Sequence, residues 1–216
     1  MLFDAAVHRL RELPAELPEG PAELLPIFTA TGLPRPRPGW GTDLADARPA
    51  AVLVLVYPDP DGVARLVLTE RADRGGHHSG EVSFPGGRAE TSDADLAATA
   101  LREAAEEVGL DAEAAGVTVL GTLPAHWIPV SGFHVTPVVA LADRVPALAP
   151  QPSEVAAILL PQLAAFLPGA PLVHVEREIR GHGIRYAAYP VDGLRVWGMT
   201  ARVLGGLGAW LGRELP

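Results

Sequence analysis

The chain has 216 residues, 48% of them hydrophobic, and a formal net charge of −9 at pH 7. This length favours one domain with additional terminal elements over two full domains, and the hydrophobic content suffices for a sizeable core. The net negative charge argues against general binding to nucleic acid or to an anionic membrane surface. Because the chain has no cysteine, disulfides, catalytic thiols and cysteine-based metal sites are excluded.

The N-terminal segment, about 1–48, predicts an arm that lies on the domain. A short amphipathic helix is expected over Asp4–Leu13, and proline-rich stretches follow at 13–26 and 34–38. Acidic and arginine residues interrupt its apolar positions, unlike a secretory signal. No apolar run in the chain approaches the roughly 18 residues of a membrane span. We therefore expect a cytoplasmic protein.

The first predicted strands form a hairpin. Ala51–Tyr57 is a continuous apolar run, which predicts a buried strand. Asp59-Pro60-Asp61-Gly62 is a turn sequence, after which Val63–Thr69 is expected to return as the second strand. Arg71 would lie at the end of that strand, where a phosphate contact and a structural ion pair are both open.

A predicted loop at Arg74–Gly80 contains the pair His77-His78. Adjacent residues of an extended chain point in opposite directions, so joint coordination of one metal ion is not expected. Substrate contact and simple surface exposure are both open for these histidines.

Three glutamates, Glu103, Glu106 and Glu107, are spaced i, i+3 and i+4. On a helix these positions share one face, so the carboxylates can converge. They would repel one another there, and a hard cation such as Mg²⁺ or Mn²⁺ would remove that cost. A solvated helix face with ordinary charge pairs is the alternative. The Pro85-Gly86-Gly87 turn favours the metal site, because its exposed backbone can approach a phosphate or offer a carbonyl oxygen to a metal.

The helix that carries these glutamates has signals at both ends. Ser92 or Asp93 is expected to cap its start, and Gly109 is expected to end it in a left-handed conformation. Arg102 lies four residues before Glu106 and is expected to pair with it. The expected apolar face consists of Ala98, Leu101, Ala105 and Val108.

Two further strands are expected after this helix, at Val117–Leu123 and Phe133–Leu141, with a loop at Pro124–Gly132 between them. Pro137 suggests that the second strand lies at a sheet edge or contains a bulge, because proline cannot donate to a ladder.

The C-terminal part predicts a hairpin and a helix. Val155–Leu160 fits either a strand or a short helix. Leu172–Arg177 and Ile184–Tyr189 are expected to pair as the two arms of a hairpin. Thr200–Leu211 predicts a final amphipathic helix, within a terminal segment of about 200–213.

Gly87 to Leu110 resembles the Nudix box, whose general pattern is G-x5-E-x7-R-E-U-x-E-E-x-G-U with U aliphatic. The second half, Arg102 to Leu110, fits except that Ala104 stands at the first U position. The first half is one residue longer than the general pattern and has Asp93 in place of its glutamate. This longer box with aspartate is similar to that of the coenzyme A pyrophosphatase branch.

An upstream motif supports the same branch, whose members carry a pattern resembling L-L-T-x-R-[SA]-x3-R-x3-G-x3-F-P-G-G. The matching residues here are Val67–Ala72, Gly80 and Phe84–Gly87. Gly76 stands where the pattern has its second arginine, so Arg74 or His77 is expected to substitute, or affinity for coenzyme A to be weaker.

The resemblance implies an α/β (α+β) fold, the Nudix α/β/α sandwich with a mixed sheet between helices. It also implies hydrolysis of the diphosphate of coenzyme A to adenosine 3′,5′-bisphosphate and 4′-phosphopantetheine, with Mg²⁺ or Mn²⁺ as the cofactor. It identifies the metal ligands as Glu103, Glu107, Glu106 and the Gly87 carbonyl. Arg102 would orient these carboxylates, and Glu154 is either a second-metal ligand or base, or an ordinary cap. The residues expected to contact substrate are Arg71, Arg74, Arg88 and His77.

Two other functions stay open at this point. One is a Nudix pyrophosphohydrolase for ADP-ribose, NADH, a dinucleotide or a dNTP. The other is a Nudix-fold binding protein without catalysis, against which the complete set of glutamates argues. The expected partner is a small-molecule substrate rather than nucleic acid or membrane, and a homodimer is open.

Overall fold

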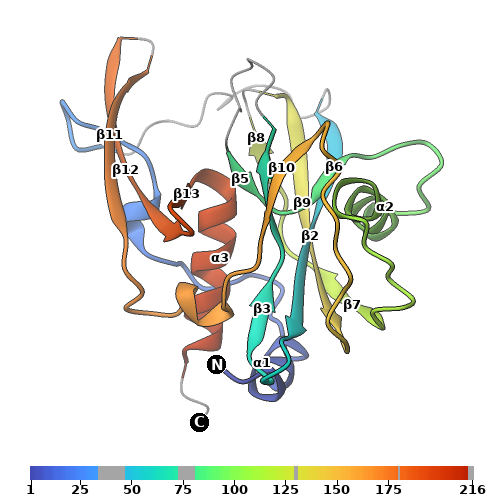
Figure 1. Ribbon diagram of the computed structural model, residues 1–216. Helices are drawn as coiled ribbons and strands as arrows, with labels where there is room; N and C mark the ends of the chain where they lie inside the picture. Colours follow the sequence, from blue (N-terminus) through green and yellow to red (C-terminus); the bar gives the residue numbers. More distant parts are fainter. Residues whose placement is uncertain (34–46, 73–80, 129–130, 180, 214–216) are drawn as a thin grey trace.

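The computed structural model describes residues 1–33, 47–72, 81–128, 131–179 and 181–213, and its centre is a mixed six-stranded sheet (Figure 1). β2 (Arg48–Pro58) and β9 (Phe133–Ala142) pair in parallel at its middle. The other four strands pair antiparallel with one of these two: β3 (Ala64–Leu66) and β6 (Gly86–Arg88) with β2, and β7 (Val117–Thr122) and β8 (His126–Ile128) with β9.

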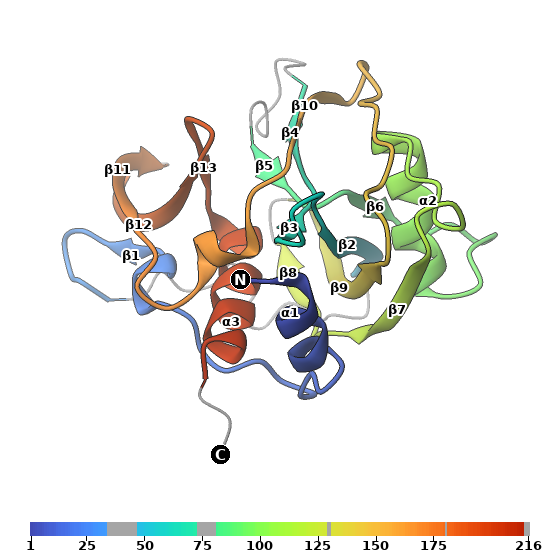
Figure 2. The same ribbon diagram turned by 60° about the horizontal axis from the view of Figure 1, so that its bottom comes forward.

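Helices cover both faces of this sheet (Figures 1 and 2). Side chains alternate along a strand, so Leu53 and Leu55 of β2 pack toward α2 (Leu96–Val108), in one of two hydrophobic clusters. Val54 and Val56 point the other way, into a cluster with α1 (Phe3–Leu10) and α3 (Gly198–Leu211). The expected sandwich, with a mixed sheet between helices, is therefore confirmed.

A second sheet has β4 (Leu68–Arg71) between β5 (Val82–Ser83) and β10 (Val155–Leu159). The prediction of one strand over Val63–Thr69 is therefore wrong, because the chain changes sheets after Leu66. Beyond that point β6 and the Pro85 carbonyl occupy the edge of β2, where Pro85 accepts from Leu53 N at 2.8 Å. The second arm of the hairpin must leave β2, and it pairs with β5 and β10 instead.

A third sheet lies beside α3 (Figure 1). It joins β11 (Val173–Ile179), β12 (His182–Val191) and β13 (Leu194–Val196) with the short N-terminal strand β1 (Ile27–Phe28). The predicted C-terminal hairpin and final helix are both confirmed. Two short 3₁₀ helices complete the described chain, η1 (Ala22–Leu24) and η3 (Leu163–Phe166).

The sheet pairing resolves two further expectations. The segment after Glu154 is the strand β10, since its backbone pairs with β4. The predicted loop at Pro124–Gly132 contains the strand β8, which is a correction.

Pro137 does not mark an edge, because β9 is a central strand. Its carbonyl accepts from Leu123 N at 2.9 Å, so its ring nitrogen faces the same side, where the neighbouring ladder is interrupted between β7 and β8.

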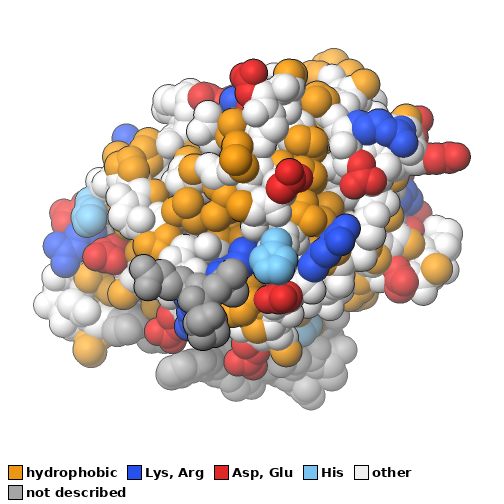
Figure 3. All heavy atoms as spheres, turned by 90° about the horizontal axis from the view of Figure 1, so that it is seen from below, with side chains coloured by type: hydrophobic (Ala, Val, Ile, Leu, Met, Phe, Trp, Pro, Cys, Tyr) orange, Lys and Arg blue, Asp and Glu red, His pale blue; other side chains and the backbone are white. Residues whose placement is uncertain are grey.

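The face of the molecule seen from below carries a broad hydrophobic area with acidic, arginine and histidine side chains interspersed around it (Figure 3). Within the described ranges, no helix is both long and apolar enough to cross a membrane.

Removal of the Tyr189 hydroxyl is expected to stabilise the fold. The side chain is buried against Phe166 in an edge-to-face contact, and its hydroxyl oxygen has no hydrogen-bond partner among the described residues. Burial also raises the pKa of Tyr189 to about 12. Because an unsatisfied buried hydroxyl is costly, Tyr189→Phe is expected to raise the free energy of unfolding by about 1 kcal/mol.

Urea denaturation measures this change. Tyr57→Phe is the matched control, because Tyr57 is also buried but its hydroxyl is not among the buried polar atoms that lack a hydrogen-bond partner. A loss of stability in Tyr189→Phe would instead indicate a hydroxyl bonded to buried water.

Candidate active site

Asp95 caps the start of the glutamate helix α2, since its Oδ1 accepts from Ala98 N at 2.8 Å. The expected caps Ser92 and Asp93 are therefore wrong by a few residues. The carboxylate of Asp93 is used elsewhere, as described below, so it is not available as a cap. The expected end is confirmed, since Gly109 follows the helix with a φ of 66°.

The buried face of α2 also differs from the prediction. Its buried residues are Thr99, Ala100, Ala104 and Val108, and Ala105 is exposed. The two small alanines on this face allow the helix to lie close against β2, with which it shares a hydrophobic cluster. Glu103 and Glu107 flank this buried face, whereas Glu106 lies toward solvent.

The Gly-Gly turn touches both of the inner glutamates. Gly86 N donates to Oε2 of Glu107 at 3.0 Å. A Cβ added to Gly87 would lie 2.6 Å from the carboxylate carbon and both oxygens of Glu103. Only a residue without a side chain allows this approach, so the second glycine is explained by the position of Glu103.

Arg102 is the centre of an ion-pair network beside these carboxylates. Its Nε and Nη2 donate to the two oxygens of Asp93 at 2.9 and 3.1 Å. Its Nη1 donates to Glu103 at 3.0 Å and to Glu106 at 3.1 Å, which confirms the expected pair with Glu106. Nη2 also donates to the carbonyl of Arg88 at 3.0 Å. Arg102 thereby ties the turn, the loop before α2 and two glutamates together.

The network has opposite effects on the pKa values of its members. Hydrogen bonds from Arg102, and then from Glu90 N, hold the pKa of Asp93 far below its ordinary value, and the bond to Asp93 raises that of Arg102. The side chain of Glu103 is 15% exposed against 58% for Glu106. The three glutamates therefore differ in environment: Glu106 is solvated beside Arg102, while Glu103 and Glu107 form the inner pair.

Burial disfavours the charge on both inner glutamates. It is the main cause that raises the pKa of Glu107 to about 7, and the charges of Glu103 and Glu154 add to it. Burial likewise raises the pKa of Glu103, with further increases from Glu106 and Glu154. The negative charges of Glu103 and Glu107 are thus both disfavoured by burial and by mutual repulsion, and a bound cation would stabilise them.

Arg71 and Glu154 reach the same place from the second sheet. Val155 of β10 pairs with Arg71 of β4, and Ala72 N donates to the Glu154 carbonyl at 2.8 Å. Arg71 lowers the pKa of Glu107, whereas Glu154 raises it. The register of β4 and β10 thus brings together one cation and one acid that lie 83 positions apart in the sequence. The resemblance had already implied that Glu154 is either a second-metal ligand or base, or an ordinary cap.

The remaining predicted substrate contacts are less well placed. Arg74 and His77 lie at 73–80, outside the described residues. Arg88 is exposed and takes part in the site through its carbonyl oxygen, which accepts from Arg102.

The donor set fits a hard divalent cation in kind. Glu103 and Glu107 provide carboxylate oxygens whose charges are disfavoured by burial. Mg²⁺ takes only a few protein carboxylates and fills its other coordination positions with water and phosphate. Within the described ranges, no three His, Asp or Glu side chains already stand as a complete metal site. Glu103, Glu107, Glu106 and the Gly87 carbonyl therefore stay the predicted ligands, with the inner pair best placed.

This site can be compared with known proteins. A sequence model described as the NUDIX domain matches residues 47–176, which is more than half of the chain. The chain belongs to the Nudix family. It is accordingly a Nudix hydrolase, and Nudix hydrolases generally use divalent metals such as Mg²⁺ or Mn²⁺.

Two similar proteins carry the name "Uncharacterized Nudix hydrolase NudL". The one from Enterobacter sp. is 37% identical over 179 residues, which cover 82% of this chain and 90% of that protein. The one from Cronobacter sakazakii is 38% identical over 178 residues, with 82% and 90% covered. A solved Nudix hydrolase, RenU from M. smegmatis, is 29% identical with a TM-score of 0.47 and covers 55% of this chain and 73% of its own.

Because Gly87 lies against Glu103, Gly87→Ala is expected to reduce activity without unfolding the protein. In Gly87→Ala the added methyl would displace the Glu103 carboxylate, and kcat should fall about 10- to 100-fold. The midpoint of urea unfolding should change little, because the crowded atoms belong to the end of a flexible side chain rather than to the backbone.

Gly183→Ala is the matched control, since Gly183 lies in β12, away from the glutamates, and its methyl would crowd only the side chain of Thr29, which follows β1. An unchanged kcat in Gly87→Ala would mean that the described position of Glu103 is not the one used in catalysis.

Proposed function

We propose that this Nudix hydrolase cleaves the diphosphate of coenzyme A, giving adenosine 3′,5′-bisphosphate and 4′-phosphopantetheine. The observation that supports the substrate is the juxtaposition of the two halves of the upstream motif. β4, which contains Leu68–Arg71, pairs with β5 just ahead of Phe84–Gly87, and Arg71 N donates to the Glu81 carbonyl at 3.0 Å. The position of Arg71 in this pairing also supports a substrate role, because its charge acts on Glu107, whose pKa it lowers.

The chain's own groups position the inner carboxylates. Asp93 holds Arg102 through both oxygens, and Arg102 in turn holds Glu103. The Gly86 amide holds Glu107. Glu103 and Glu107, with Glu106 and the Gly87 carbonyl, would hold Mg²⁺ or Mn²⁺, which supplies charge neutralisation for the diphosphate and an acidified water.

Glu154 is the proposed general base or second-metal ligand. It lies at the start of β10, and its charge raises the pKa values of both inner glutamates. A carboxylate beside the bound diphosphate would be able to accept a proton from an attacking water. Arg71 is the proposed contact to the 3′-phosphate of coenzyme A, because a guanidinium forms paired hydrogen bonds with phosphate oxygens.

Arg71→Ala tests the assignment to the 3′-phosphate. KM for coenzyme A should rise about tenfold or more, and KM for 3′-dephospho-coenzyme A should rise less, since a charge-assisted hydrogen bond contributes about 1.5–3 kcal/mol. Arg185→Ala is the control, at an exposed arginine of β12. An equal rise in KM for both substrates would discard the 3′-phosphate role and leave a contact to the diphosphate.

Product analysis tests the function itself. The panel consists of coenzyme A, ADP-ribose, NADH, diadenosine polyphosphates and dNTPs with Mg²⁺ or Mn²⁺, and Glu107→Gln is the inactive control. Adenosine 3′,5′-bisphosphate from coenzyme A, lost in the variant, is the expected result. Turnover of another diphosphate alone, also lost in the variant, would refute the substrate and retain the site. No turnover of any compound would count against the proposed reaction.

A further inference from the structure

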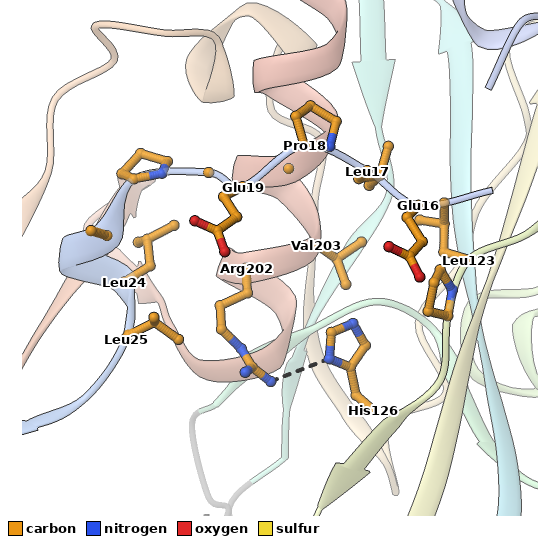
Figure 4. A pocket seen from close by; sticks show the side chains of 15 residues that line it. Glu16, Leu17, Pro18, Glu19, Leu24, Leu25, Leu123, His126, Arg202 and Val203 are labelled. Carbon is orange, nitrogen blue, oxygen red and sulfur yellow. Dashed lines mark hydrogen bonds between the residues drawn. The ribbon is translucent and has the colours of Figure 1, made fainter. Parts of the chain in front are cut away.

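A second candidate site is a cavity of about 340 Å³ between the N-terminal arm and α3 (Figure 4). The arm contributes one wall over 16–25, α3 contributes Arg202 and Val203, and the segment entering β8 contributes Leu123 and His126. The volume falls in the lower part of the range for small-molecule pockets, about 300–1,000 Å³.

This cavity is separate from the glutamate site. His126 of β8 pairs with Val135 of β9, and Val135 belongs to the cluster on the α3 side of the central sheet. The glutamate helix α2 packs on the opposite side. The arm and α3 also lie outside residues 47–176, which match the NUDIX domain. A ligand here would therefore lie between parts of the chain that flank the common domain and the β8 edge of that domain, which contributes Leu123 and His126.

One end of the cavity presents hydrogen-bond donors. The side chains of Arg202 and His126 extend toward each other (Figure 4), with Nη2 of Arg202 3.3 Å from Nδ1 of His126. If Nδ1 accepts from the guanidinium, the imidazole is neutral and its proton is on Nε2, which is then a donor. A permanently charged guanidinium beside an imidazole N–H suits a carboxylate or another small anion.

The arm side presents two acids. Glu16 and Glu19 extend from the arm toward the cavity, and both side chains are exposed at its rim (Figure 4). They favour a cationic group in the ligand. The rest of the lining is largely apolar, and includes Leu17, Leu24, Leu123 and Val203.

We propose that this cavity binds a small zwitterion with an aliphatic body. Its carboxylate would lie at Arg202 and His126, its ammonium group at Glu16 and Glu19, and its methylene chain on the leucines and Val203. The inference is independent of the reaction at the glutamates, since it concerns binding on the other side of the sheet.

A ligand series on the unmodified full-length chain tests the charge pattern. Calorimetric titration of 6-aminohexanoate is compared with that of hexanoate and of hexylamine, which each lack one charge at a similar chain length. The zwitterion is expected to bind about tenfold or more tightly than either half-ligand, because each adds only one charge-assisted contact. Equal affinity for the zwitterion and one half-ligand, or no heat with any of the three, would overturn the proposal.

Two sets of variants locate the binding. Arg202→Met should reduce the affinity for 6-aminohexanoate to that for hexylamine, and the double change Glu16→Gln, Glu19→Gln should reduce it to that for hexanoate. Arg185→Met, at an exposed arginine of β12, is the matched control and should leave affinity unchanged. Retained affinity in Arg202→Met would place the ligand elsewhere and refute the site. The Gln variants change no shape and keep the test valid if Arg202→Met does not fold.

Discussion

Glu107→Gln is expected to abolish metal-dependent hydrolysis, with kcat/KM reduced on the order of 100-fold or more. Glu107 is one of the two inner carboxylates, and its Oε2 is held by the Gly86 amide. Glutamine keeps the shape and can still accept from Gly86, but it brings no charge to a cation. Turnover of coenzyme A and of the other diphosphates with Mg²⁺ measures the effect, and full activity in the variant would remove Glu107 from the site.

The same variant should be more stable than the wild-type protein when no metal is present. Folding raises the pKa of the Glu107 carboxyl from 4.5 to about 7. The free energy of unfolding therefore falls as the pH rises through that range, because the carboxyl ionises at lower pH in the unfolded chain than in the folded protein. The loss is complete above about pH 7, and glutamine avoids it. The expected gain in the free energy of unfolding is about 3 kcal/mol at pH 8 and about 1 kcal/mol at pH 5.5.

Urea unfolding in EDTA at the two pH values measures this gain, and added Mg²⁺ should favour the wild-type protein instead. Glu106→Gln is the matched control, because its 58% exposed side chain carries little of the burial cost. A gain that does not change between pH 5.5 and pH 8 would contradict the raised pKa of Glu107.

Gly208→Ala should destabilise the fold severely, although glycine to alanine in a helix interior normally stabilises by about 1 kcal/mol. Gly208 lies in α3 where η3 crosses it, and an added Cβ would overlap the carbonyl oxygen of Phe166 and lie 2.7 Å from its carbonyl carbon. Backbone cannot move aside as a side-chain end can. We expect a loss of about 3 kcal/mol and a fall in Tm of about 6–12 °C.

Thermal unfolding of Gly206→Ala provides the graded control on the same helix. Its Cβ would lie 3.1 Å from the Pro18 carbonyl oxygen and 3.2 Å from Cβ of Leu17, so the arm has to shift by only a few tenths of an ångström. Its loss of stability should be smaller than that of Gly208→Ala. Equal or higher stability of Gly208→Ala would refute the close contact between η3 and α3.

Asp93 explains how the longer box can still orient its arginine. The loop before α2 has one extra residue and a shorter acid than the general Nudix pattern. In the structure the carboxylate of Asp93 accepts from the Glu90 amide at 2.9 Å and from the Thr99 hydroxyl at 2.9 Å. These contacts hold it against Arg102, with which it forms a two-point pair. The aspartate thus reaches Arg102 from this longer loop with both of its oxygens.

Local signals in the sequence were sufficient to predict the central strand and the helix of glutamates. An apolar run was sufficient to predict β2, and the spacing of Glu103, Glu106 and Glu107 after a Gly-Gly turn was sufficient to predict the helix, because both signals depend on residues close in the chain. The pair of Arg102 with Glu106 was predictable for the same reason.

Which distant groups lie close together depends on the pairing of strands and the packing of helices across the whole chain. The Val63–Thr69 segment divides between two sheets because β6 takes the edge of β2, and no local pattern contains that competition. The buried face of α2 passes through Ala100 and Ala104 because they fit against β2, and this separates the solvated Glu106 from the inner pair. Arg71 and Glu154 reach the inner pair through the pairing of β4 with β10. Strand pairing depends on residues distant in sequence, which is why these positions could be determined only by folding the whole chain.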